Sequence, residues 1–158
     1  MQYLYIRRGK RYRAATNTEI LDAAASIAVS QASGAALTSP QDAARLCRSL
    51  CAGYENERFG VLWLDTRHRV IHSEVLFTGT IDGASVYPRV VVKRALELNA
   101  AAAILTHNHP SGIAEPSEAD KAITGRLSQA LALVDVRLLD HLVITGDSCT
   151  SLAERGWL

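Results

Sequence analysis

The segment from His107 to Asp120 holds two histidines, two serines and three carboxylates within 14 residues. An apolar run, residues 100–106, precedes it and favours a buried strand that stops at a proline. Side chains two apart on a strand share a face, so His107 and His109 are expected to point the same way. Asn108 is expected to point the opposite way. The histidine pair could therefore present two imidazole rings to one metal ion.

Downstream of the histidines, Pro110-Ser-Gly predicts a turn, and Ser117 is a good N-cap for a new helix. Asp120 follows three residues later, and residues three apart lie on one side of a helix. Ser117 and Asp120 can therefore face whatever the histidines face. Two imidazoles and one carboxylate from different elements predict a three-ligand zinc site whose fourth position is left to water.

Both parts of this pattern also have a simpler interpretation. Ser117-x-x-Asp120 is a capping box, in which the two side chains satisfy the first backbone groups of a helix. His107-x-His109 could equally be the polar end of a strand. The spacing alone leaves these alternatives open, and the combination of the two parts is what favours a metal.

The two parts together, with Pro110 directly after His109, resemble the motif of the JAMM (MPN-plus) zinc metallopeptidases. Longer segments resemble the RadC family of bacterial JAMM-domain proteins over about residues 40–158, in the order found in that family. These segments are Phe77-Thr-Gly-Thr-Ile-Asp, Val86-Tyr-Pro-Arg-Val-Val-Val-Lys, His107-Asn-His-Pro-Ser-Gly and Leu139-Asp-His-Leu-Val-Ile.

The resemblance implies a zinc-dependent peptidase or isopeptidase with one Zn²⁺ per chain, held by His107, His109 and Asp120. It implies a glutamate general base just before a core strand, and Glu57 directly precedes the run that begins at Arg58. It also implies that Ser117 donates a hydrogen bond to the oxyanion of the reaction. The spacing does not exclude two other glutamates as the base, and these are Glu55 and Glu74.

The expected substrate is a protein or peptide of unknown identity. Asn108 stands where deubiquitinating JAMM enzymes usually carry Ser or Thr, and no insertion resembles their ubiquitin-gripping loops, so the resemblance does not extend to ubiquitin. An alternative function is a non-catalytic interaction module of the same fold, associated with DNA-processing systems. A zinc nucleoside deaminase would need a Pro-Cys-x-x-Cys beside its His-x-Glu, and the sequence has no Pro-Cys-x-x-Cys.

The hydrophobic periodicity predicts an α/β fold with a mixed sheet between helices. The resemblance implies the three-layer JAMM arrangement, which is similar to that of cytidine deaminases. Helices are expected from a capping box at Thr16 to about Gly34, from Ser39-Pro40 to Gly53, from Pro88 to about Asn99, and from Ser117 onward. The residues expected to be buried are 20, 21, 24, 27 and 28 in the first helix and 43, 46, 47, 50 and 51 in the second. In the third they are 91, 92, 95 and 98, and in the fourth 123, 127, 130 and 134. Strands are expected at 58–65 and 70–77, paired as an antiparallel hairpin, at the histidine run, and at 136–145.

The composition is close to neutral, with 17 basic and 16 acidic residues, so bulk charge favours neither nucleic acid nor an anionic membrane as a partner. No apolar run reaches membrane length and no signal peptide is evident, which makes a cytoplasmic protein the expectation. Cys47 and Cys51 have helical spacing and Cys149 is distant, a pattern typical of core residues. His68 and His72 are expected to be ordinary surface or strand residues.

The chain is expected to be one domain, residues 1–158, with a short N-terminal strand and helix at about 1–38. The resembled family carries a helix-hairpin-helix module ahead of this domain, and the sequence leaves no room for one. Residues 3–13 carry three tyrosines and, from Arg7 to Arg13, five basic side chains. They favour a solvated edge strand, with a nucleic-acid-binding arm as the alternative. Asp140 and His141 are expected either to support the metal ligands or to be buried polar residues.

Overall fold

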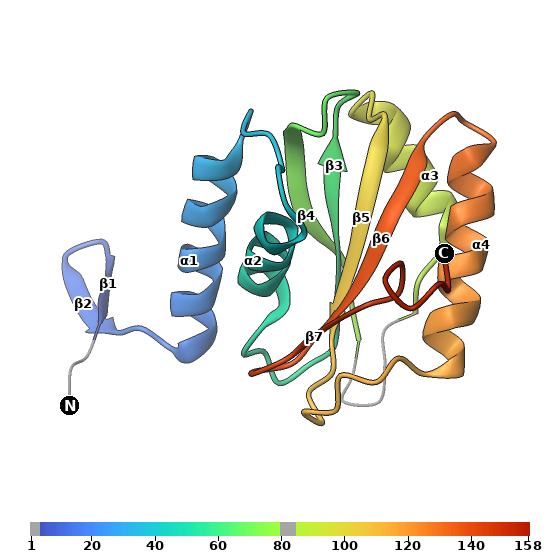
Figure 1. Ribbon diagram of the computed structural model, residues 1–158. Coiled ribbons are helices and arrows are strands. Elements are labelled where there is room, and N and C mark those ends of the chain that lie inside the picture. The colour runs from blue at the N-terminus through green and yellow to red at the C-terminus, as the bar shows by residue number, and fades with distance from the viewer. Residues whose placement is uncertain (1–3, 80–84) are drawn as a thin grey trace.

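The computed structural model describes residues 4–79 and 85–158, and its centre is a five-stranded mixed sheet (Figure 1). The strands lie in the order β4, β3, β5, β6, β7, in which β5 and β6 run parallel and the other neighbours antiparallel. Their bounds are β3 Arg58–Leu64, β4 Val70–Thr78, β5 Ala102–Asn108, β6 Arg137–Ile144 and β7 Cys149–Ser151.

Helices cover both faces of this sheet, so the molecule has three layers (Figure 1). One face carries α2, Pro40–Cys51, with α1, Asn17–Ala32, packed outside it. The other face carries α3, Pro88–Glu97, and α4, Glu118–Ala132. The predicted α/β fold with a mixed sheet between helices is confirmed. None of the helices in the described ranges is both long and apolar enough to cross a membrane.

Helix α2 shows how the sequence specifies one layer. Ser39 caps it, Pro40 fills the first turn, and Asp42 completes a capping box. The predicted stripe is confirmed in full, because all five residues are buried: Ala43, Leu46, Cys47, Leu50 and Cys51. Burial raises the pKa of the Cys51 thiol to about 12, as expected of a core residue that does no redox chemistry.

The central strand β5 is buried along its whole length, as its apolar run predicts. Its side chains alternate between two cores, one under α2 and one under α3 and α4. Ala102 and Ile104 enter the first core, whereas Ala103 and Leu105 enter the second. The rigid centre of the sheet therefore continues directly into the histidine segment at its end.

Three predicted helical stripes differ in part from the structure, and in α3 only Val91 and Ala95 of the predicted four are fully buried. In α1 no residue is fully buried, and Ile27 is 59% exposed because alanines give this helix an apolar surface on nearly every side. In α4 the fully buried residues are Thr124, Leu127 and Leu131. Of the predicted set only Leu127 is among them, and the other three are half-buried: Ile123, Ala130 and Val134.

Two further features correct the predicted strands. Residues 4–16 do not form one edge strand of the main sheet but a separate two-stranded hairpin, β1 Tyr5–Arg8 and β2 Arg11–Ala14. Strand β7 was not predicted, because its three residues carry no pattern of their own. Among the resembled segments, residues 80–82 of the Phe77–Asp82 stretch lie outside the described residues.

Replacing Leu105 with alanine is expected to destabilise the protein by about 2–5 kcal/mol, because its side chain is fully buried between the sheet and two helices. The free energy of unfolding can be measured by urea denaturation. Leu133→Ala is the matched control, since Leu133 is 87% exposed and the same atoms are removed from the surface. Equal losses in the two variants would contradict this account of the core.

Candidate metal centre

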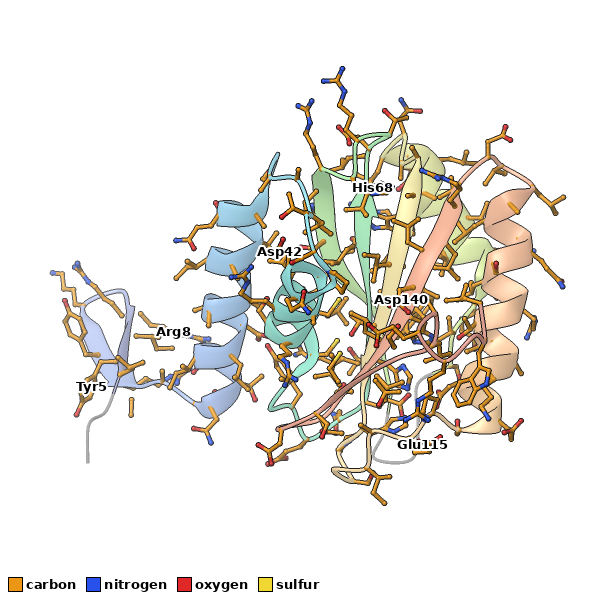
Figure 2. The ribbon with its side chains drawn as sticks, viewed as in Figure 1. Tyr5, Arg8, Asp42, His68, Glu115 and Asp140 are labelled. Atoms are coloured by element: carbon orange, nitrogen blue, oxygen red, sulfur yellow. The ribbon has the colours of Figure 1, made fainter. Side chains whose placement is uncertain are left out.

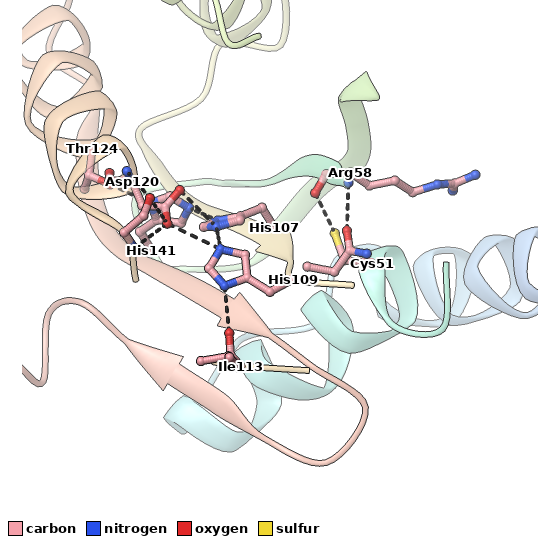
Figure 3. Close-up of polar contacts among 10 residues, drawn as sticks. Cys51, Arg58, His107, His109, Ile113, Asp120, Thr124 and His141 are labelled. Atoms are coloured by element: carbon pink, nitrogen blue, oxygen red, sulfur yellow. Dashed lines mark hydrogen bonds and ion pairs between the residues drawn. The ribbon is translucent and has the colours of Figure 1, made fainter. Parts of the chain in front are cut away.

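His107, His109 and Asp120 meet at the end of β5 and the beginning of α4 (Figure 3). The Nε2 atoms of the two histidines lie 2.9 Å apart. The Nε2 atom of His107 lies 3.2 Å from Oδ1 of Asp120, and that of His109 lies 3.3 Å from Oδ2. Each residue offers one donor atom, and these atoms all lie within 4.8 Å of one another, so the group could hold a metal ion.

The group is enclosed on one side and open on the other. The side chain of His107 is 1% exposed, whereas those of His109 and Asp120 are 17% and 14% exposed. The ring of Phe59 stacks beside His107, with an interplanar angle of 15°, and forms an apolar wall. A ligand would therefore approach past His109 and Asp120.

The hydrogen bonds of His109 fix which of its ring nitrogens is free. Its Nδ1 lies 2.8 Å from the backbone carbonyl oxygen of Ile113, and a carbonyl only accepts, so Nδ1 carries the hydrogen. Nε2 then keeps its lone pair in the neutral ring and points it toward His107 and Asp120. The backbone N–H of His109 also donates to Ile144, which anchors the residue to β6.

His107 is held from behind by a chain of buried polar groups (Figure 3). Its Nδ1 lies 2.8 Å from Nε2 of His141, and Nδ1 of His141 lies 2.5 Å from Oγ1 of Thr124. The Thr124 hydroxyl donates in turn to the carbonyl oxygen of Asp120. If each N–H and O–H in this series of hydrogen bonds donates toward the Asp120 carbonyl, the hydrogen of the neutral His107 ring is on Nδ1. Nε2 of His107 then has a free lone pair for a metal.

His141 is fully buried, and burial together with the neighbouring His107 holds its pKa well below the ordinary value. A neutral His141 can accept a hydrogen bond from His107 while donating one to Thr124. Of the two predicted roles, support of the metal ligands is thus the one that the geometry favours.

Asp140 has a different role, because its carboxylate joins strands. It accepts hydrogen bonds from the backbone N–H groups of His141 and Ala153 and from the hydroxyl of Ser151. These bonds hold β7 and the turn after it against β6, so Asp140 is a half-buried polar residue that stabilises the fold.

Asp120 caps α4 and faces the histidines at once. The hydroxyl and the backbone N–H of Ser117 both donate to Oδ2 of Asp120, and the N–H of Asp120 donates back to the Ser117 hydroxyl. The capping box and the metal group were alternatives in the sequence. In the structure they coexist, and the box fixes the orientation of the carboxylate.

The charges at the centre stabilise one another. Burial alone would raise the pKa of Asp120, but the rings of His107 and His109, when they carry a hydrogen on Nε2, donate to this carboxylate and hold its pKa far below the ordinary value. The hydrogen bond to Asp120 raises the pKa of His109, burial offsets part of this, and the nearby charge of Glu57 adds to the rise. The site therefore favours a bound positive charge.

Glu57 lies at the same end of the sheet as the histidines. Phe59 of β3 pairs with His107 of β5 in the last pair of this register, Glu57 lies just before β3, and His109 lies just after β5. The ring of Phe59 stacks on His107, and the charge of Glu57 helps to raise the pKa of His109, so Glu57 is close to the histidines. Glu57 is half-buried there, and its carbonyl oxygen accepts a hydrogen bond from Gly79.

The two competing glutamates lie elsewhere. Glu74 accepts hydrogen bonds from Nε1 of Trp63 and from the guanidinium of Arg94, which commits it to the packing of β3, β4 and α3. Glu55 is exposed and lines a cavity of about 210 Å³ on the α1 side of the molecule. Of the three glutamates, the charge of Glu57 is the one that acts on His109.

Asn108 points away from the metal group, as its alternation with the histidines predicts, because its partners are Tyr54, Asn56 and Arg58. Its side-chain oxygen accepts from the N–H of Arg58 at 2.7 Å, and its amide donates to the carbonyls of Tyr54 and Asn56. The residue is 3% exposed. Asn108 thus fixes the backbone on both sides of Glu57, a role that sequence reasoning missed because it depends on a contact 50 residues away.

The remaining histidines take no part in the centre. His68 occupies the left-handed region, with φ of 57°, in the turn between β3 and β4. His72 lies on β4, 3.8 Å from Glu74. Both are ordinary turn and strand residues, as the sequence predicts.

The family model for the RadC-like JAB domain matches residues 37–157, which include every residue of the metal group. The chain belongs to the RadC family. The match begins at the end of the α1–α2 connection, so the RadC domain comprises the sheet, α2, α3 and α4, and excludes the N-terminal hairpin and α1.

Several relatives called UPF0758 protein are similar to this RadC chain. One from Thioalkalivibrio sulfidiphilus is 63% identical over 82% of this chain and 57% of its own length, and one from Vibrio parahaemolyticus is 59% identical over 79% and 56%. The chain thus spans little more than half the length of these two relatives. One from Vibrio cholerae is 56% identical over 89% of each chain. These names describe no reaction.

Replacing His141 with asparagine is expected to weaken Zn²⁺ binding by about ten- to a hundredfold, because His107 loses the partner that fixes its tautomer and orientation. Thr124→Val, which removes only the far end of the chain of hydrogen bonds, should weaken binding in the same direction and by less. The affinity can be measured by competition with a chromophoric chelator.

His72→Asn is the control for these variants, since its side chain is 39% exposed and lies outside the metal group. Unchanged affinity in both His141→Asn and Thr124→Val, with the fold intact by circular dichroism, would show that the buried chain does not support the ligand.

Proposed function

We propose that this protein is a zinc-dependent hydrolase of peptide or isopeptide bonds. The observation that carries the proposal is the convergence of His107, His109 and Asp120, with Glu57 near enough for its charge to act on His109. The RadC-like JAB domain family supports it, because the chain's metal group stands inside the matched region.

The donor set fits zinc better than it fits magnesium or calcium. Two imidazole nitrogens and one carboxylate are borderline donors, whereas Mg²⁺ and Ca²⁺ prefer oxygen ligands alone. Tetrahedral donors at zinc distances are separated by roughly 3.3 Å, close to the 2.9 to 3.3 Å seen here. Zinc bound there would lower the pKa of its water to about 7.

Glu57 is proposed as the general base and acid of the reaction. The charge of its carboxylate acts on His109, at the open side of the centre, where Glu57 would take a proton from the attacking water and return it to the leaving amine. Its backbone is held on both sides by the hydrogen bonds of Asn108 to Arg58 and Asn56. This positioning supports proton transfer and does not require Glu57 to bind the metal.

Ser117 is proposed to donate a hydrogen bond to the oxyanion. Its side chain is exposed at the N-terminus of α4, next to Asp120, so a substrate can reach it. The hydroxyl donates to Asp120 in the structure and would have to turn toward the substrate. The N-terminal end of α4 adds its partial positive charge at the same place.

One zinc ion per chain is expected, held by His107, His109 and Asp120. His109→Ala should lose most of the zinc, because two donors are too few for a stable site. Elemental analysis of protein purified without chelators or added metal gives the stoichiometry. Zinc far below one per chain, or full zinc in His109→Ala, would contradict the assignment of the ligands.

Glu57→Gln is expected to retain zinc while losing activity by about a hundredfold to ten-thousandfold, because the amide cannot transfer the proton. A peptide-library cleavage screen, with and without chelator, supplies the substrate for the rate measurement. Glu55→Gln is the matched control, since Glu55 is exposed and two residues away.

Glu74→Gln should also stay active, although it loses the ion pair with Arg94 and is less stable. A dead Glu74 or Glu55 variant beside a fully active Glu57→Gln would refute the choice of base. Zinc in the wild type without turnover of any substrate, in a screen that a known peptidase passes, would instead favour a non-catalytic module.

A further inference from the structure

The N-terminal hairpin carries the main concentration of positive charge in the sequence. Residues 7–13 hold five basic side chains, and no acidic residue precedes Glu19. The other 12 basic residues are outnumbered by the 16 acidic ones, so the rest of the chain has a net charge of −4 with histidines neutral. A formal net charge of +1 therefore conceals two parts of opposite sign.

The hairpin stands apart from the RadC domain. It extends from the N-terminal end of α1, away from the five-stranded sheet (Figure 1), and Tyr5 and Arg8 lie far from Asp140 of β6 (Figure 2). It also precedes residue 37, where the family match begins. The hairpin is thus accounted for neither by the metal centre nor by the family.

The register of the hairpin sorts its side chains onto two faces. Directly paired residues share a face, and the pairs are Tyr5 with Ala14, Ile6 with Arg13, Arg7 with Tyr12, and Arg8 with Arg11. Arg13 forms an ion pair with Glu19 of α1, so its face turns toward that helix. The opposite face, which carries Tyr5, Arg7 and Tyr12, turns away from the protein.

The outward face presents two bare aromatic rings beside one cation, Arg7. Tyr5 is 63% exposed and Tyr12 is 67% exposed, and the guanidinium carbon of Arg7 lies 6.0 Å from the centre of the Tyr12 ring. Within the described residues, only Arg13 of the five hairpin cations has an ion-pair partner. Arg8, Lys10 and Arg11 are exposed on the other face and the turn.

We propose that the hairpin β1–β2 binds single-stranded nucleic acid. The cations would contact the phosphates, and the two tyrosine rings would stack on unpaired bases. The charge of the rest of the chain repels a polyanion, so binding is confined to the hairpin. The shared chemistry, a phosphodiester backbone with unpaired bases, is common to DNA and RNA.

Two other partners suit the surface less well. A duplex offers phosphates but keeps the faces of its bases stacked, so exposed Tyr5 and Tyr12 would gain little. An anionic membrane would be bound by apolar side chains on one face opposite a basic face. Here arginines occupy both faces, and Ile6 is half-buried among them.

The test measures binding of the full chain to a fluorescent 20-mer by anisotropy, at several salt concentrations. Its arms are single-stranded DNA, single-stranded RNA of the same sequence, the DNA duplex, and vesicles with 30% phosphatidylserine. We expect one or both single strands to bind more tightly than the duplex does. We also expect this binding to weaken as the salt concentration rises. The comparison of DNA with RNA tells which of the two the hairpin prefers.

Variants separate stacking from charge. Tyr5→Thr with Tyr12→Thr keeps strand-forming residues and should weaken single-strand binding tenfold or more, whereas Tyr5→Phe with Tyr12→Phe keeps the rings and should bind normally. Arg8→Gln with Arg11→Gln should reduce the slope of log affinity against log salt by about 1.4, at about 0.7 for each phosphate contact.

The matched charge control is Arg67→Gln with Arg126→Gln, which removes two exposed cations from the RadC domain and should change nothing. No detectable binding of either single strand at about 50 mM salt would overturn the proposal. So would tighter binding of the duplex, binding of the vesicles alone, or full affinity in the double threonine variant. Zinc content and cleavage are measured separately, so failure here leaves the proposed hydrolase untouched.

Discussion

The antiparallel pairing of β3 with β5 is the constraint on which the metal centre depends. Because side chains alternate along a strand, this one register puts Phe59 on the same face as His107, and it brings Glu57, just before β3, to the end of the sheet where His109 follows β5. It also turns Arg58 and Asn108 to the other face, where the amide of Asn108 ties the two strand ends together. A shift of the register by one residue would exchange the two faces and separate the glutamate from the histidines.

A second consequence follows from the depth of His107. A nearly inaccessible imidazole needs a partner for each ring nitrogen, and His141 can serve as one because it is buried and neutral. The partners of His141 lead back through Thr124 to α4, the same helix that presents Asp120. His107 and Asp120 are thus connected in two ways, directly at the metal group and through His141 and Thr124 behind it. A displacement of α4 would therefore disturb both residues.

The sequence predicts what local pattern determines and fails where tertiary contacts decide. The buried residues of α2 are predicted correctly, because its apolar residues recur at helical spacing among polar ones. The many alanines of α1 do not define one apolar face, so its buried residues are not predicted. Strand β7 has three residues and is held by contacts of Asp140 with Ser151 and Ala153, which no local pattern reveals. The metal group follows from short spacings, and its support by His141 rests on a contact across 34 residues.

The hairpin differs from the rest of the fold in what stabilises it. A two-stranded hairpin without a covering layer is only marginally stable in water. The contacts that stabilise this hairpin lie mainly at its turn and at its base, where it joins α1. Gly9, with φ of 63°, suits the two-residue turn, and Glu19 joins the base by binding both Arg13 and the N-cap residue Thr16. Glu19 is therefore both the capping-box residue of α1 and the anchor of the hairpin. Five cations in seven residues repel one another, so a bound polyanion would relieve that repulsion and stabilise the hairpin by the same contacts that hold the ligand.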